Sequence, residues 1–195
     1  MHLNTIGRFI KLMSGLAIFG FGLATMVHAR IGIAPWDVFA QGLSKLTHLS
    51  FGTCTVLTSI LVLIAWIPLK LKYGLGTVMN ALFIGVFADL TAPLVPQATS
   101  YPMQLVMFVL GMATAAFATG MYISANFGAG PRDGLMVGTS KILHKPIWMV
   151  RTGFELIVMT LGWLMGGQVR EGTLIFALSI GYLMQLAFRL FKYQK

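Results

Sequence analysis

Six long apolar runs constrain the fold of this chain more than any other feature. They lie near residues 9–28, 51–69, 75–95, 103–125, 147–166 and 172–190. A helix of about 20 apolar residues crosses the hydrocarbon core of a bilayer. Only 10% of the residues are charged and the mean hydropathy is +0.82, whereas soluble domains carry about 25% charged residues. The sequence therefore predicts an all-α membrane protein with six transmembrane helices.

The basic residues give this arrangement an orientation. With the N-terminus placed in the cytoplasm, eleven of the 14 Lys and Arg residues fall on the cytoplasmic side, Lys192 and Lys195 among them, and three fall outside. Cytoplasmic loops of membrane proteins carry an excess of Lys and Arg. Both termini are therefore expected in the cytoplasm. The same residues account for the net charge of +9 without a nucleic-acid partner, because no dense basic patch is present.

The chain aligns with itself at an offset of 96 residues. Residues 8–94 match residues 104–190 without a gap, and the identities cluster. The segment G-I-A-P-W-D at 32–37 meets G-A-G-P-R-D at 128–133. Each repeat contains three spans, and an odd number forces the second repeat to cross the membrane in the opposite direction. The prediction is a single membrane domain of two inverted three-helix repeats, a design that many secondary transporters share.

A stripe of small residues, spaced by four, recurs in the third and sixth runs. It consists of Thr77, Ala81 and Gly85 in the first repeat and of Thr173, Ala177 and Gly181 in the second. Residues four apart share one face of a helix, and small residues let helix backbones approach closely. The third and sixth spans are therefore expected to meet at the pseudo-symmetry axis. Leucine at Gly85 or Gly181 is expected to overpack that contact.

Each repeat also contains a short Gly-Pro-Asp element before its second span. The residues are Gly32, Pro35 and Asp37 in the first copy and Gly128, Pro131 and Asp133 in the second. Proline suits the first turn of a helix and an acid suits its N-terminal end. Two interpretations stay open. Each short helix lies at the interface with its aspartate as a cap, or it is re-entrant and brings both aspartates to a central site.

Acidic residues inside the apolar runs are the remaining candidates for function. Glu155 lies within the fifth run and Arg151 one helical turn before it. An intramembrane charge is unfavourable unless it is paired or solvated. The pair is either structural or part of a substrate or coupling site, and the first repeat has Thr55 and Ser59 at these positions. Asp89 is a candidate for the same site or a hydrogen-bond partner within the helix pair.

Several of these segments together resemble the bacterial YczE/YyaS/YitT-type membrane proteins. The segments are G-I-A-P-W-D-V, G-L-G-T-x-x-N-A from residue 74, G-A-G-P-R-D-G-L-M, R-T-G-F-E-L from residue 151 and E-G-T-L from residue 171. The resemblance covers nearly the whole chain. It implies a protein of the bacterial inner membrane and, for Arg132 and the other motif residues, signature positions without an assigned chemistry.

The sequence as a whole predicts a small secondary transporter or permease that acts as a homodimer. We expect no enzymatic activity, cofactor or metal, because no nucleophile triad, zinc-ligand spacing or phosphate-binding loop is present. An unidentified small molecule would contact Arg132, Asp133, Arg151 and Glu155 from the cytoplasmic side and Asp37 and Asp89 from the outer side. The alternative is a scaffold, regulatory or substrate-capture subunit that binds another membrane protein.

Overall fold

The computed structural model describes residues 4–191, except for the side chains at 147 and 148, and every regular element in this part of the chain is a helix. Four helices form the first half: α1 (Thr5–Ala29), α2 (Pro35–Thr47), α3 (Phe51–Trp66) and α4 (Leu75–Thr91), followed by a 3-10 turn (Ala92–Leu94). Four helices form the second half: α5 (Tyr101–Ile123), α6 (Pro131–Leu143), α7 (Ile147–Leu164) and α8 (Glu171–Leu190).

The two halves share their helix boundaries and their irregular backbone at the offset of 96 residues. Helices α2 and α6 begin and end at equivalent positions, and α1, α3 and α4 begin at positions equivalent to the starts of α5, α7 and α8. Every described residue with a positive φ has an equivalent with a positive φ: Arg30 and Asn126, Gly32 and Gly128, His48 and His144, Lys70 and Gly166. Residues other than glycine rarely adopt this conformation, so the correspondence extends to the loops.

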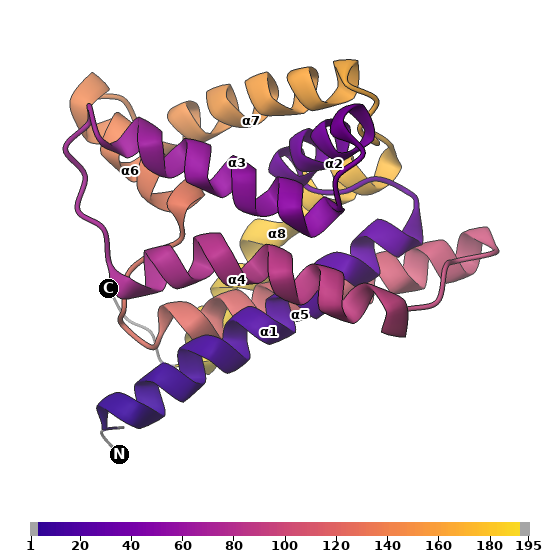
Figure 1. Cartoon of the computed structure of the whole chain (residues 1–195), viewed down its shortest axis with the longest axis horizontal. Coiled ribbons are helices and arrows are strands. Elements are labelled where there is room, and N and C mark those ends of the chain that lie inside the picture. The colour runs from indigo at the N-terminus through magenta and orange to yellow at the C-terminus, as the bar shows by residue number, and fades with distance from the viewer. Residues whose placement is uncertain (1–3, 192–195) are drawn as a thin grey trace.

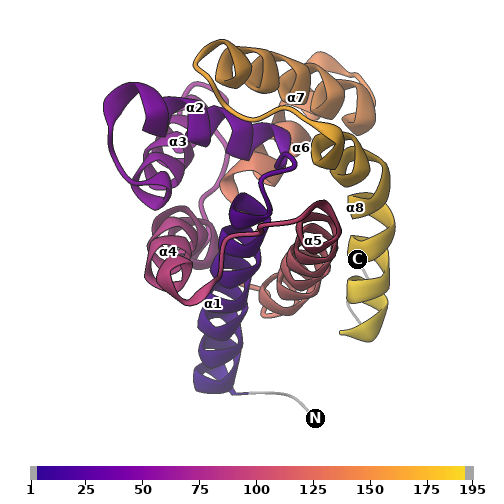
Figure 2. The ribbon, with the colours of Figure 1, turned by 90° about the vertical axis from the view of Figure 1, so that its right-hand side faces the viewer.

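The helices are arranged in two layers (Figure 1). One layer contains α1, α4, α5 and α8, with α1 and α5 packed along each other at its centre. The second layer contains α2, α3, α6 and α7 (Figure 2). Within it α2 packs on α7, and α3 contacts α6. The main apolar core lies between the central helices, where Leu12, Leu16 and Phe108 are fully buried.

Reciprocal backbone hydrogen bonds join the two halves. The Gly76 N–H at the start of α4 donates to the Phe127 carbonyl at 2.8 Å, and the equivalent Gly172 N–H donates to the Ile31 carbonyl at 2.6 Å. These amides belong to the first turns of α4 and α8, where an intrahelical acceptor is missing. Each half therefore completes a helix end of the other.

The surface of the structure is that of a membrane protein. Four helices are long and apolar enough to cross a bilayer, namely α1, α4 with its 3-10 turn, α5 and α8. A fifth span is possible if α2 and α3, which meet at a bend of 117°, form one broken span. Large apolar side chains such as Leu110, Leu178 and Tyr182 are exposed, and extensive exposed apolar surface marks a membrane or partner contact.

All six predicted apolar runs are helices, but the predicted contact between the third and sixth spans is wrong. Helices α4 and α8 lie on opposite sides of the central α1–α5 pair (Figure 2). Gly85 of α4 packs instead on α3, and the Thr77 hydroxyl donates to the Ala129 carbonyl. Ala177 and Gly181 of α8, by contrast, are exposed. The stripe cannot reach the centre because the long apolar helices α1 and α5 already occupy it.

Candidate functional site

The Gly-Pro-Asp elements place two helix N-termini inside the protein. Gly32 and Gly128 have φ values of +113° and +114°, which favour glycine. A Cβ at Gly32 would lie 2.7 Å from the Thr173 hydroxyl, so the loop approaches the other half too closely for a side chain. Proline then occupies the first turn of both α2 and α6, and an aspartate follows two residues later.

These two N-termini border a cavity of about 120 Å³ to which all eight helices contribute. Of the 24 residues that line it, 22 form eleven pairs at the offset of 96 residues. The pairs are Phe19 and Ala115, Leu23 and Thr119, Met26 and Tyr122, Ala34 and Gly130, Pro35 and Pro131, Trp36 and Arg132, Asp37 and Asp133, Thr55 and Arg151, Ser59 and Glu155, Asn80 and Phe176, Ile84 and Ile180. The cavity therefore lies where the two halves face each other, and most of its pairs differ in chemistry.

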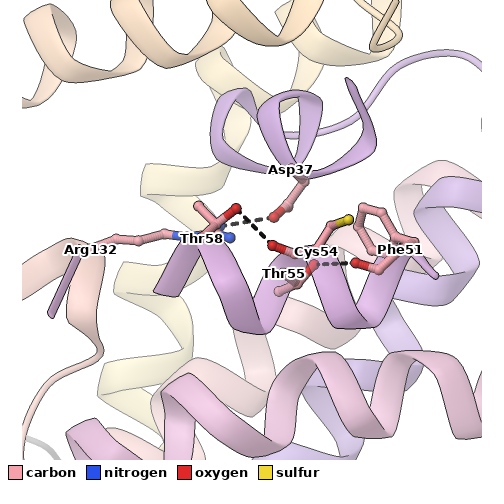
Figure 3. A network of polar contacts seen from close by, with 6 residues as sticks. All are labelled: Asp37, Phe51, Cys54, Thr55, Thr58 and Arg132. Atoms are coloured by element: carbon pink, nitrogen blue, oxygen red, sulfur yellow. Dashed lines mark hydrogen bonds and ion pairs between the residues drawn. The ribbon is translucent and has the colours of Figure 1, made fainter. Parts of the chain in front are cut away.

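An ion pair crosses from one half to the other beside this cavity. The Arg132 guanidinium donates to the Asp37 carboxylate at 2.9 Å. Figure 3 shows Arg132 reaching from the start of α6 to Asp37 at the start of α2, beside α3. The Arg132 guanidinium also lies 5.6 Å from the centre of the Trp36 ring. Asp37 is only 3% exposed, so Arg132 is the main compensation for its charge.

A second ion pair lies within α7. The Arg151 guanidinium donates to Glu155 at 2.8 Å, one turn later on the same face. Asp133 lies in the electrostatic field of both Arg132 and Arg151, and its carboxylate has no hydrogen bond or ion pair with any residue that the structure describes. With all five groups counted as ionised, three carboxylates and two guanidiniums give the cavity lining a formal charge of −1.

Five of the six predicted site residues are brought together: Asp37, Arg132, Asp133, Arg151 and Glu155 all line this cavity. The sequence interpretation missed Trp36, Thr119 and Tyr122. Trp36 could have been found through the offset, because it is the equivalent of the candidate Arg132, whereas Tyr122 is the equivalent of Met26, which gives no such signal. Among the residues that the structure describes, no group of three or more His, Cys, Asp or Glu side chains is placed to hold a metal ion.

The structure places Asp89, the sixth predicted residue, outside the cavity. Its carboxylate accepts hydrogen bonds from the Ser50 hydroxyl and, at 2.8 Å, from the Gly52 N–H. Ser50 is the N-cap of α3, so Asp89 of α4 caps the start of the neighbouring helix. This geometry corresponds to the alternative of a hydrogen-bond partner within the helix pair. The equivalent residue in α8 is Gln185.

Replacing Asp89 with alanine is expected to lower the stability of the fold by about 1–3 kcal/mol, because the Gly52 N–H and the Ser50 hydroxyl lose an ionised acceptor. The measurement is the apparent melting temperature of the purified variant in detergent. Gln185→Ala is the matched control, since Gln185 is exposed and at the equivalent position. Equal melting temperatures for the two variants would contradict the capping role.

The fold and the cavity define a class of protein: an integral membrane protein of helices, with a charged cavity between two equivalent halves. Residues 6–189 match a family of unknown function, DUF6198. The chain belongs to this family.

Its relatives are bacterial proteins without an assigned activity. The chain is 38% identical over 174 residues to an uncharacterized protein of Haemophilus influenzae, covering 89% of this chain and 80% of the relative. It is 29% identical over 190 residues to the uncharacterized membrane protein YczE of Bacillus subtilis, covering 96% and 88%. It is also 26% identical to YyaS of Bacillus subtilis over 166 residues, covering 83% and 82%. No solved structure matches the fold.

Proposed function

We propose that this protein is a small secondary transporter or permease of the bacterial inner membrane, built as two inverted repeats of three spans each. The equivalent helix boundaries and the reciprocal hydrogen bonds of Gly76 and Gly172 support the repeat. In this proposal α3 and α7 are the second span of each repeat, and α2 and α6 are re-entrant. Transporters of this design hold substrate between the repeats, at the ends of broken helices.

The observation that carries the proposal is the pairing of the cavity residues. Because eleven equivalent pairs line it, the cavity lies at the interface between the two halves. Transporters built from inverted repeats bind their substrate at this interface. The pair Asp37 and Asp133 supplies one carboxylate from each half. The formal charge of −1 favours a substrate or coupling ion that brings one positive charge, since unpaired charge inside a membrane protein is unfavourable.

The proposed orientation places both termini in the cytoplasm. Two of the eleven basic residues assigned to that side, Arg132 and Arg151, line the cavity. Lys192 and Lys195 are also among the eleven and lie outside the described residues. Without the two cavity arginines the counts become nine and three, so the excess of basic residues that indicates the cytoplasmic side persists. We propose that the protein acts as a homodimer and that it is not an enzyme.

Neutralising the cavity acids is expected to reduce transport strongly at low substrate concentration while leaving the protein folded. Asp133→Asn and Glu155→Gln each remove a charge that would contact the transported cation or proton. The loss of a charge-assisted contact corresponds to roughly a 10- to 100-fold drop in apparent affinity. The assay follows proton flux in proteoliposomes that contain a pH-sensitive dye, during addition of a panel of cationic metabolites and drugs.

Glu171→Gln is the matched control, because Glu171 pairs with Arg170 at the start of α8 and does not line the cavity. Flux that is lost in the two cavity variants and kept in this control supports the proposal. Absence of any flux across the panel, together with a stable partner that co-purifies with the protein, would favour a scaffold or regulatory subunit instead.

A further inference from the structure

The two halves differ in the contact between their last two helices, which are α3 and α4 in the first half and α7 and α8 in the second. In the first half α3 packs along α4, and a Cβ at Gly85 would lie 2.1 Å from the Gly52 carbonyl oxygen. In the second half, α7 and α8 make almost no contact within the described chain. A Cβ at Gly181, the equivalent of Gly85, would have no described atom within 4 Å. Among the described residues, the contact that closes one side of the protein therefore has no counterpart on the other.

The sequence of the second half lacks the groups that close the first. Gly52 is the residue that lets α3 approach α4, and position 148, its equivalent, is not a glycine. Asp89 ties α4 to the start of α3, whereas its equivalent Gln185 is exposed. Any Cβ at the Gly52 position would lie 2.0 Å from a backbone oxygen, so the second half cannot adopt the same packing. The gap between α7 and α8 is thus a property of the sequence.

This gap exposes one wall of the central cavity. Thr55 and Ser59, which line the cavity from α3, are 2% and 5% exposed. The side chains of their equivalents on α7, Arg151 and Glu155, are 39% and 23% exposed. On α8, Phe176 and Ile180 are partly exposed, whereas the equivalent residues on α4 are buried. The charged cavity therefore opens sideways, between α7 and α8.

The exposed faces of α7 and α8 are apolar. Leu156 and Ile157 of α7 are 53% and 58% exposed, and Leu178 and Tyr182 of α8 are 76% and 78% exposed. Side chains of this kind on a long apolar helix face lipid. The opening thus leads from hydrocarbon into a cavity with a formal charge of −1. The apolar outer end suits the tail of an amphipathic cation, and the negatively charged inner end suits its head group.

We propose that the ligand of the cavity is an amphipathic monocation that enters from the bilayer between α7 and α8. Its charged head lies against Glu155 and Asp133, and its apolar tail remains in the gap beside Gly181. This inference rests on the proposed function, since it names the substrate class of the same cavity.

The test uses a long-chain alkyl trimethylammonium with a diazirine in its chain, photolysed with the full-length protein in lipid nanodiscs. Mass spectrometry then locates the labelled residues. We expect labelling on the facing surfaces of α7 and α8, competed by tetramethylammonium and lowered about tenfold by Glu155→Gln. The facing surfaces of α3 and α4 are the internal control, because they are equivalent to those of α7 and α8 but are packed against each other.

A bulky residue in the gap provides a steric test. Gly181→Trp is expected to lower the labelling about tenfold, and Gly181→Leu is a smaller substitution to use if the tryptophan variant does not fold. Gly153→Trp is the matched control, because a Cβ there also has no described atom within 4 Å, and Gly153 does not line the cavity. Equal labelling in the Gly181 and Gly153 variants would overturn the proposal.

The remaining outcomes separate this inference from the proposed function. Glu155-dependent flux with no more labelling at α7–α8 than at α3–α4 overturns the inference and leaves transport standing. Glu155-dependent labelling of the gap without any flux supports the inference and argues against transport. Crosslinking between two copies through Gly181→Cys in a Cys54→Ala background, with no labelling by the probe, would show that a second copy fills the gap and would overturn the inference.

Discussion

Replacing Gly85 with leucine is expected to prevent the accumulation of folded protein. A Cβ at this position would lie 2.1 Å from the Gly52 carbonyl oxygen and 2.8 Å from a methyl group of Val56. Overpacking usually lowers stability by about 1–3 kcal/mol, and here the clash is with backbone, which cannot rotate away. Helices α3 and α4 would separate and the Asp89 cap would be lost. The measurement is the yield of monodisperse protein in detergent and its apparent melting temperature.

Gly181→Leu is the matched control, with the same substitution at the equivalent position. The sequence alone predicted equal damage at both glycines, but a Cβ at Gly181 would have no described atom within 4 Å. Leucine also has a higher helix propensity than glycine. We therefore expect a change in stability within about 0.5 kcal/mol, as for other surface substitutions. Damage as severe as in Gly85→Leu would show that α8 packs against α7 after all.

Replacing Arg132 with glutamine is expected to produce the second large effect. The substitution leaves Asp37, at 3% exposure, without the partner that lies 2.9 Å away. Removing one partner of a buried ion pair lowers stability by about 3–5 kcal/mol. The side chain of Arg132 is 24% exposed, so we expect a value near the lower end, about 3 kcal/mol. The melting temperature in detergent should fall accordingly.

Replacing the other partner of the ion pair, Asp37→Asn, is expected to lower stability less. It leaves Arg132 with Asp133 still in its field and with access to the cavity. The double variant Asp37→Asn/Arg132→Gln should be more stable than Arg132→Gln alone, because neither charge is left unpaired. Such a cycle measures the coupling of the pair. Purely additive losses would contradict an ion pair that joins the two halves.

The positions of the helices could be predicted from the sequence because they depend on local signals. Each apolar run is a helix, and both Gly-Pro-Asp elements begin a short helix. The contacts between helices could not be predicted in the same way. The small-residue stripe containing Gly85 shows that α4 approaches another backbone closely, but the partner depends on which helices fill the centre. The sequence pattern alone contains no such information.

Part of the candidate site could be predicted from the charged residues within the apolar runs. A charge there is unfavourable unless it is paired or solvated, so it marks a candidate for function. That argument selected Arg151 and Glu155, and both line the cavity. It could not decide between the two roles left open for Asp89, because a carboxylate that caps a neighbouring helix and one that faces a cavity have the same local sequence. It also missed Trp36 and Tyr122, since aromatic residues are common in membrane spans. The repeat offset, applied to each charged residue in turn, would have selected Trp36 as the equivalent of Arg132, but not Tyr122, whose equivalent is Met26.

The connections between the two halves also constrain how the chain is made. A ribosome delivers the N-terminal half first, and Asp37 leaves it 95 residues before Arg132. During that interval the buried carboxylate has no partner, the Gly76 amide has no Phe127 carbonyl to bind, and α2 has no α7 to cover it. Soluble domains commonly fold one after another during synthesis. In this protein the contacts that complete the N-terminal half therefore form only after the second half has been made.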